Sequence, residues 1–418
     1  MKKQKTKKNK AKKAVRREKI IDIYLDYASA TPVSKSVNEA MTAVSGIFAN
    51  PGAIHAKGVE AKKLVADARV RIAKAIDARE EEIIFTASAT ESNSLALSGV
   101  VDAWQNMYPG ETPHVIISAI EHPSVIEATL LLEEEGVELS RVPVDEFGVV
   151  DLVELKNLLK PNTVVVSIMM ANNEIGTIEP LDAISKMLRR YKKEMQFSRY
   201  PLLHTDASQA FQYLPVRVVK PEVDLMTISS SKIYGPRGVA LLYVKNTTPI
   251  FSQMPGGGQE HGRRGGTEAT SLIVGFARAM EDVVGMRHKE SERLRKIFEY
   301  GKSELQKKIP DAVLLGHSTK RLPNNFTFAV PGVESEYLVL ALSAKHIFAS
   351  SRSACQSDNQ NDETLDSHVI MAIGGNPSDG TIRFSFGRDT REKDIQNALK
   401  VVAEAVEKWR SWSHAHKV

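Results

Sequence analysis

Two stretches decide the fold: Leu203-His204-Thr205-Asp206-Ala207-Ser208-Gln209 and Thr227-Ile228-Ser229-Ser230-Ser231-Lys232-Ile233-Tyr234-Gly235-Pro236-Arg237-Gly238. In each, an apolar run typical of a buried strand gives way to polar residues. Asp206 stands at the end of the first strand, and Lys232 stands in a loop of small residues after the second. The carboxyl ends of parallel strands meet at one edge of a sheet, where ligands bind. We therefore expect Asp206 and Lys232 to lie side by side at such an edge.

Outward from these stretches, short apolar runs alternate with segments whose apolar residues recur at helical spacing. The alternation predicts an α/β fold around a mostly parallel sheet. The expected strands are 83–86, 115–119, 163–171, 201–206, 225–229 and 239–244, and the expected helices between them include 125–135 and 152–159.

The order changes near Gly265, after which a long helical pattern runs from Thr267 to about Lys308. Strands are expected beyond it at 324–330, 348–351 and 381–386, between further helical stretches. We predict a basic tail over residues 1–19, a large domain over 20–270, and a long linking helix with a smaller α+β domain over 271–418.

Charge is distributed unevenly along the 418 residues. The net charge is +5, but residues 1–19 hold eleven Lys or Arg and a single acid, for a local charge of +10 that leaves −5 on the rest. Such a segment buries too little apolar surface to order itself, and we expect a disordered tail. Contact of this tail with RNA is one interpretation, and a solvated charge run is the other.

The composition excludes several classes of protein. No apolar run approaches the roughly 18 residues of a membrane-spanning helix, and the tail lacks the apolar segment of a secretory signal, so we predict a cytoplasmic protein with no membrane contact. The single cysteine, Cys355, excludes an internal disulfide and an all-thiolate metal site.

A phosphate site is indicated at Thr86-Ala-Ser-Ala-Thr-Glu-Ser-Asn93, between a strand and a helix. The first turn of a helix offers backbone N–H groups and a positive dipole end to an anion. Thr90 as an ordinary N-cap, and Lys232 as a surface lysine, are the plainer interpretations. Taken together, lysine, acid and phosphate turn are the groups that pyridoxal phosphate requires.

The chain from Ile23 onward resembles the cysteine desulfurases, a group of class V aminotransferase-like pyridoxal phosphate enzymes. Many motifs agree in order and spacing, which implies fold type I with a large and a small domain. The motifs are Tyr24-Leu-Asp-Tyr-Ala28, Asn50-Pro-Gly-Ala-Ile-His55, Ala89-Thr-Glu-Ser-Asn93, Glu121-His122, Asn172-Asn-Glu-Ile-Gly176, His204 to Gln209, Ser229 to Gly238, Gly256-Gly-Gly-Gln-Glu260, Arg264, Gly266-Thr267, Ser353-Ala-Cys355 and Ile382-Arg-Phe-Ser-Phe-Gly-Arg388.

The resemblance implies a role for each matched position. Lys232 would form the Schiff base, Asp206 would pair with the pyridine nitrogen, and His122 would stack on the ring, although a buried core histidine is the plainer interpretation of His122. Asn173 and Gln209 would reach the phenolic oxygen. Contacts to the phosphate are implied for Ala89, Thr90, Ser229, Ser231 and, from the partner of a homodimer, Thr267.

Substrate chemistry is implied at three positions. Asn173 and Arg383 would bind the substrate, the arginine through its fit to a carboxylate. Cys355 would accept sulfur, and its polar surroundings argue against the buried cysteine that is the usual alternative. An ordinary thiol is only a few per cent ionised at neutral pH, so it needs activation.

The predicted function is removal of sulfur from L-cysteine, which gives L-alanine and a persulfide that passes to a sulfur-acceptor protein in iron–sulfur assembly or tRNA thiolation. A selenocysteine lyase or another class V enzyme is one alternative. A nucleic-acid-binding or scaffold protein with a relic site is another. Two positions depart from the family pattern: Ser231, where histidine is usual, which predicts altered cofactor retention, and Tyr27, where asparagine is common.

Overall fold

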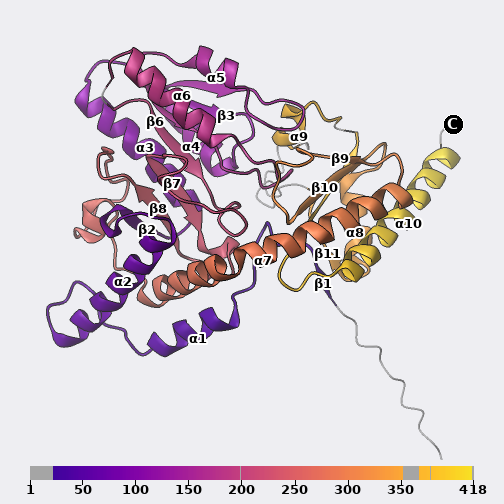
Figure 1. Cartoon of the computed structure of the whole chain (residues 1–418), viewed down its shortest axis with the longest axis horizontal. Coiled ribbons are helices and arrows are strands. Elements are labelled where there is room, and N and C mark those ends of the chain that lie inside the picture. The colour runs from indigo at the N-terminus through magenta and orange to yellow at the C-terminus, as the bar shows by residue number, and fades with distance from the viewer. Residues whose placement is uncertain (1–21, 198, 352–366, 377, 417–418) are drawn as a thin grey trace, which may run out of the picture.

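The computed structural model describes residues 22–197, 199–351, 367–376 and 378–416. Cys355 and the basic tail over residues 1–19 lie outside the described residues. A seven-stranded sheet with its helices forms the larger part, and the long helix α7 (Thr270–Lys308) runs from it to a second group of strands and helices (Figure 1).

The seven strands form one mostly parallel sheet, as predicted. Their order is β2-β8-β7-β6-β5-β3-β4, and only β8 runs antiparallel to its neighbours. Both β2 and β7 run antiparallel to β8, so β2 and β7 point the same way. The strands are β2 (Ile83–Thr86), β3 (His114–Ser118), β4 (Glu138–Val142), β5 (Thr163–Ser167), β6 (Leu202–Asp206), β7 (Leu225–Ser229) and β8 (Ala240–Val244).

Helices cover both faces of this sheet, which explains why its inner strands β5, β6 and β7 are buried at every residue rather than at alternate ones. One face packs on α3 (Ala89–Met107) and α4 (Pro123–Glu134). The other packs on α2 (Ala56–Ala75), α5 (Leu152–Leu158), α6 (Leu181–Glu194) and α7. Alternate residues of one strand serve the two cores: Ile83 and Phe85 face one and Ile84 faces the other.

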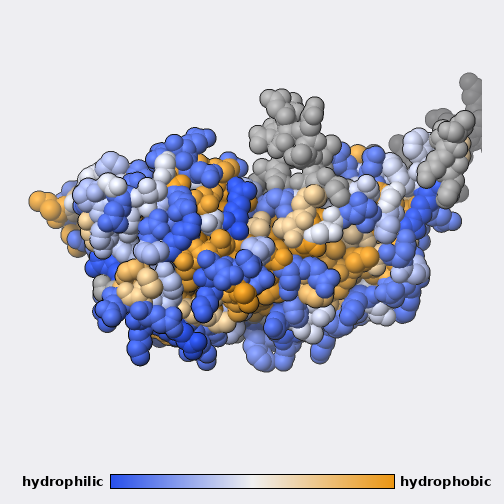
Figure 2. Space-filling view, turned by 90° about the horizontal axis from the view of Figure 1, so that it is seen from above, coloured by the Kyte–Doolittle hydropathy of each residue, from blue (hydrophilic) through white to orange (hydrophobic). Residues whose placement is uncertain are grey.

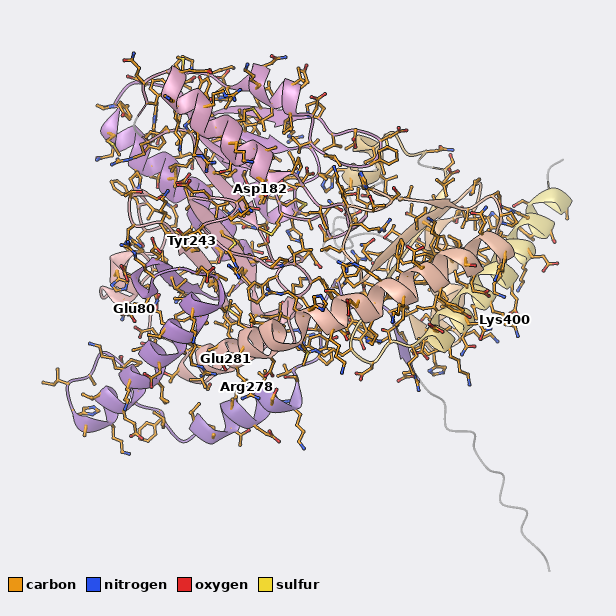
Figure 3. All side chains as sticks on the ribbon, viewed as in Figure 1. Glu80, Asp182, Tyr243, Arg278, Glu281 and Lys400 are labelled. Atoms are coloured by element: carbon orange, nitrogen blue, oxygen red, sulfur yellow. The ribbon has the colours of Figure 1, made fainter. Side chains whose placement is uncertain are left out.

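The early helices α1 (Lys35–Val44) and α2 lie against the first half of α7. Arg71 of α2 holds Glu281 of α7 through two N–H donors, at 2.6 and 2.5 Å. Figure 3 shows Glu281 and Arg278 on the stretch of α7 that passes α1 and α2. Three short 3-10 turns complete this part: η1 (Glu80–Glu82), η2 (Ser230–Lys232) and η3 (Gln259–Gly262).

The second group is built on a three-stranded antiparallel sheet in the order β12-β10-β9. Its core is a cluster of phenylalanines around Phe326, whose ring centroid lies 5.5 to 6.4 Å from four others. Its elements are β9 (Val313–Leu314), β10 (Asn325–Val330), β12 (Gly380–Ser385), α8 (Ser335–Ser343), α9 (His368–Ala372) and α10 (Glu392–His416).

The start of the described chain belongs with this second group. The strand β1 (Ile23–Tyr24) pairs in parallel with β11 (Ile347–Phe348), and Asp26 forms a bridge with Ser385 of β12. The hydrogen bonds of β1 therefore run to the C-terminal part, although the sequence interpretation groups residues 20–270 in the large domain. The division at residue 270 stays a prediction.

Two strand boundaries also differ from the sequence prediction. The strand expected over 163–171 ends at Ser167, although the apolar residues after it remain buried. The strand expected over 348–351 is β11, which ends at Phe348, and Ser350 makes only a single bridge, to Arg383. Within the described ranges, no helix combines the length and the apolar character needed to cross a membrane.

Tyr27, which departs from the family pattern, is buried against a glycine. A Cβ on Gly387 would lie 2.2 Å from the Tyr27 ring, far inside van der Waals contact. We expect Gly387→Ala to lower the free energy of unfolding by about 1–3 kcal/mol, because the ring must move within a packed core. Urea unfolding measures the change.

The matched control for this substitution is Gly285→Ala, in α7. A Cβ there meets no atom within 4 Å, so the change should raise stability by about 0.5–1 kcal/mol through the lower backbone entropy of the unfolded chain. Equal stability of the Gly387 variant and the parent would contradict the contact with Tyr27.

Candidate functional site

The sheet topology brings five loops to one edge. Strands β2, β3, β5, β6 and β7 all point the same way, so the segments after their carboxyl ends gather there. These segments carry the α3 N-terminus, His122, Asn173, Asp206 and Lys232.

Asp206 is the last residue of β6 and is 8% exposed. Its Oδ1 accepts a hydrogen bond from the backbone N–H of Ser208 at 2.9 Å. Its Oδ2 accepts one from Nδ2 of Asn93, on α3, also at 2.9 Å. N–H donors on both oxygens thus fix the orientation of this buried carboxylate.

Lys232 ends η2, directly after the neighbouring strand β7. Its Nζ donates to the carbonyl oxygens of Ala28, at 2.9 Å, and Ser29, at 2.6 Å. The Nε2 of Gln209 donates to the same oxygen of Ala28 at 2.9 Å. Lys232 and Gln209 therefore meet at residues 26–30, which we name the first turn.

Arg383 reaches the same turn from β12 of the second sheet. Its Nη2 donates to Oδ1 of Asp26 and to Oγ of Ser29, both at 2.9 Å. Its Nη1 donates to the carbonyl of Asn173 at 3.1 Å. Only 2% of Arg383 is exposed, and its buried Nε has no partner among the described residues. A guanidinium held at one end with a spare N–H is suited to a further anion.

His122 is the N-cap of α4. Its Nδ1 accepts from the backbone N–H of Ser124, at 3.1 Å, and lies 2.9 Å from the Ser124 hydroxyl. Burial lowers the pKa of His122 below its ordinary value; nearby Asp206 opposes the shift, while Lys232 and His368 add to it. Both Asp206 and Lys232 thus lie close enough to His122 to act on its charge.

The N-terminus of α3 differs from one sequence interpretation. The N-cap is Ser88, whose hydroxyl accepts from the N–H of Glu91, while the Glu91 carboxylate accepts from the N–H of Ala87 at 2.7 Å. Thr90 as the N-cap is therefore wrong. Ala89 and Thr90 occupy the first two helical positions, whose N–H groups lack partners within a helix. Thr90 is exposed at this end.

Three serines line the turn before Lys232. The hydroxyls of Ser229 and Ser231 lie 3.0 Å apart. The backbone N–H of Ser229 donates to the hydroxyl of Ser208 at 3.1 Å, and the carbonyl of Ser231 accepts from Thr31. The hydroxyl of Ser231 thus lies beside that of Ser229.

Thr267 takes part in none of the hydrogen bonds described above for this group. Thr267 lies between η3 and α7 and lines a cavity of about 170 Å³ with Ala87 and Arg264. Arg264 is fixed there by an ion pair with Glu91 at 2.7 Å. Cys355 lies outside the described residues.

The sequence analysis missed Asn93, Ser124, Asp26 and Glu121 as individual site residues. All except Ser124 stand inside the matched motifs, which is the signal that was available. Glu121 is wholly buried; its Oε1 accepts from the Ser118 hydroxyl and the Met169 N–H, and its Oε2 has no partner among the described residues. Burial raises the pKa of Glu121 to about 8.

Comparisons with known proteins identify the family of the chain. The model of the family "Aminotransferase class-V" matches residues 23–398. Cysteine desulfurase IscS of Dictyoglomus turgidum is 40% identical over 395 residues, 94% of this chain and 96% of the relative. Cysteine desulfurase IscS 1 of Archaeoglobus fulgidus is 38% identical over 94% of this chain and 99% of the relative. The chain belongs to the cysteine desulfurases of the class V aminotransferase family.

Solved structures of the family have the same fold. A NifS-like protein superposes with a TM-score of 0.83 at 32% identity, over 93% of this chain and all of that one. SspA, solved in complex with cysteine, gives 0.72 at 30% identity, over 87% of this chain and 98% of that one. Fold type I is thus confirmed, and the chain is an enzyme of a family that works with pyridoxal phosphate.

Two buried glutamates make the free energy of unfolding depend on pH. Burial raises the pKa of both Glu121 and Glu179 to about 8, against about 4.3 for an unfolded glutamate. Between these values the folded chain binds protons that the unfolded chain does not. The stabilisation is therefore complete below about pH 4 and is lost as the pH rises through about 8.

We expect Glu121→Gln to make the free energy of unfolding fall less steeply between about pH 5 and 8, by about one proton. Urea unfolding at a series of pH values measures this slope. Glu179→Gln should act in the same way, whereas Glu39→Gln on the surface of α1 should leave the slope as it is. An unchanged slope in both buried variants would mean that these carboxyls ionise in the folded chain.

Proposed function

We propose that this enzyme is a pyridoxal phosphate-dependent cysteine desulfurase that converts L-cysteine to L-alanine and holds the sulfur as a persulfide on Cys355. The observation that carries the proposal is the meeting of Lys232, Gln209 and Arg383 at the first turn, beside Asp206 and His122. These residues bring together an amine, a buried carboxylate and a guanidinium from separate elements. Such a set of groups fits one small amino-acid substrate.

The donor set fits the cofactor. Asp206 is a buried carboxylate whose two oxygens each accept from one N–H donor, and a carboxylate held in this way suits a pyridine nitrogen. The α3 N-terminus, with Ala89 and Thr90, and the paired hydroxyls of Ser229 and Ser231 suit a phosphate. Ser231 offers a hydroxyl where the family has a ring N–H, so the type of donor changes but a donor remains.

Each residue of the candidate site has its own role in the proposed reaction. When bound, pyridoxal phosphate supplies an electron sink for the substrate α-carbon. Lys232 would hold the cofactor and would take the proton from the substrate α-carbon. Arg383 would bind the substrate carboxylate with Asn173 beside it, and His122 would cover the ring and pass protons. The Cys355 thiolate attacks the substrate sulfur, and the bond between that sulfur and the β-carbon breaks with its electron pair left on the carbon.

A homodimer fits the surface of the chain. Phe48 and Ile54, in the connection between α1 and α2, are 92% and 98% exposed. Figure 2 shows a hydrophobic projection at that end of the molecule. Large apolar side chains so exposed mark an interaction surface, and we infer that a second copy covers them and supplies Thr267 to the neighbouring phosphate site.

The remaining partners follow from the chemistry and the charge. The persulfide passes to a sulfur-acceptor protein of iron–sulfur assembly or tRNA thiolation, in the cytoplasm. The tail over residues 1–19, with its charge of +10, adds nonspecific contact with RNA.

Lys232→Ala tests the covalent anchor. We expect loss of the cofactor absorbance band and a loss of cysteine turnover of at least about a thousandfold, because the chain then lacks both its attachment point and its base. Borohydride reduction of the parent enzyme, followed by peptide mapping, should fix the cofactor on Lys232. Lys245 also follows a strand of this sheet, but at the opposite edge, so Lys245→Ala is the matched control. Label on any other lysine would refute the assignment.

Cys355→Ser tests the sulfur acceptor. The variant should bind the cofactor and give the parent's spectral change with L-cysteine, because those steps precede attack by the thiol. It should form no persulfide. In the presence of a thiol reductant, it should release sulfide at no more than about 1% of the parent rate. Normal release of sulfide by the serine variant would indicate β-elimination without an enzyme thiol, as in a lyase.

A further inference from the structure

Four buried or half-buried residues form a continuous chain of hydrogen bonds across the site. Nδ2 of Asn93 donates to Oδ2 of Asp206 at 2.9 Å and to Oγ of Ser124 at 2.8 Å. The Ser124 hydroxyl in turn lies 2.9 Å from Nδ1 of His122. The chain therefore joins the carboxylate at the end of β6 to the imidazole that begins α4.

The direction of every bond in this chain follows from its acidic end. An ionised carboxylate only accepts, so Asn93 must present its NH₂ group to Asp206. The opposite Oδ1 of Asn93 is left buried without a partner among the described residues, a cost that this orientation explains. Both amide hydrogens are then used, since the second goes to Ser124.

The Ser124 hydroxyl accepts from Asn93 and has one hydrogen of its own, which it gives to Nδ1 of His122. The backbone N–H of Ser124 donates to the same nitrogen at 3.1 Å. This N–H belongs to the first turn of α4 and cannot reverse its direction. Nδ1 of His122 therefore receives two donors and has no room for a proton of its own.

We propose that Asn93 and Ser124 are positioning residues that fix His122 as a neutral imidazole with its ring proton on Nε2. His122 then exchanges protons only through Nε2, and its ring orientation is tied to Asp206. The role of His122 in catalysis rests on the proposed function, but its protonation state does not.

Other groups act on the same ring through their charge. Among the described residues these are Asp206, Lys232 and His368, of which Asp206 favours a charged ring and the other two oppose it. The neighbouring Glu121 turns its carboxyl away, to Ser118 and Met169, and its carbonyl accepts from His368 at 2.9 Å. Burial and these charges act on the pKa of His122, and the two donors of Ser124 act on it in addition.

The test is nitrogen NMR of the full chain, loaded with cofactor and labelled with ¹⁵N-histidine. The signals of His122 are assigned by their absence in His122→Phe. In the parent, Nδ1 should have the shift of an unprotonated nitrogen and Nε2 that of a protonated one from about pH 6 to 8. A protonated Nδ1 in this range would overturn the proposal whatever the variants do.

Variants then locate the cause. Ser124→Ala should raise the midpoint of His122 protonation by roughly half to one pH unit, as expected for one lost hydrogen bond. Asn93→Leu should shift it in the same direction, because the serine hydroxyl is then free to turn. Ser124→Thr, which keeps the hydroxyl, should restore the parent value.

The matched control is Ser185→Ala, which removes another buried serine hydroxyl, on α6, that donates to the carbonyl of Glu222 at 2.9 Å and takes no part in the hydrogen bonds of His122. It should lower stability to a similar degree but leave His122 unchanged. Equal midpoints in Ser124→Ala, Asn93→Leu and the parent would refute the positioning role. If cysteine turnover fails while the tautomer is as expected, the proposed function is wrong and this inference stands.

Discussion

The first turn, residues 26–30, is the constraint on which the site depends. Its carbonyl oxygens accept from Lys232 and Gln209 of the large sheet, while Asp26 and Ser29 accept from Arg383 of the second sheet. The turn is itself fixed to the second sheet, since the N–H of Ala28 donates to Ser385. A short piece of backbone thus sets the separation between the Lys232 amine, which we propose as the base, and the Arg383 guanidinium, which we propose as the substrate-binding group.

Much of the large sheet was predictable from the sequence, since buried parallel strands leave apolar runs bounded by polar residues. The pairing of β1 with β11 was not, because a strand of two residues has no periodicity. The misassigned N-cap has a similar cause. Ser88 and Thr90 are both good caps, and the deciding signal is Glu91, three residues after Ser88, whose N–H donates to the Ser88 hydroxyl and whose carboxylate accepts from the N–H of Ala87.

The residue types of the candidate site were predictable from the sequence, but the hydrogen bonds that connect them were not. Asp206 and Lys232 follow from their places at strand ends, and Arg383 from family resemblance. The chain through Asn93 and Ser124 depends on the direction of side chains from α3 and α4, which neither periodicity nor motif spacing determines. Glu121 was missed because its meaning depends on burial, which turns an ordinary acid into one that keeps its proton at neutral pH.

The pairing of β1 with β11 limits how this chain can be shortened or fused. The tail can be trimmed only up to the residues that precede Ile23, because a cut beyond them removes β1 and then the carbonyls that hold Lys232. A protein fused at the amino terminus would emerge beside the C-terminal sheet rather than beside α3. Affinity handles and reporter domains at that end would therefore crowd the second sheet and leave the edge of the large sheet at the α3 N-terminus open.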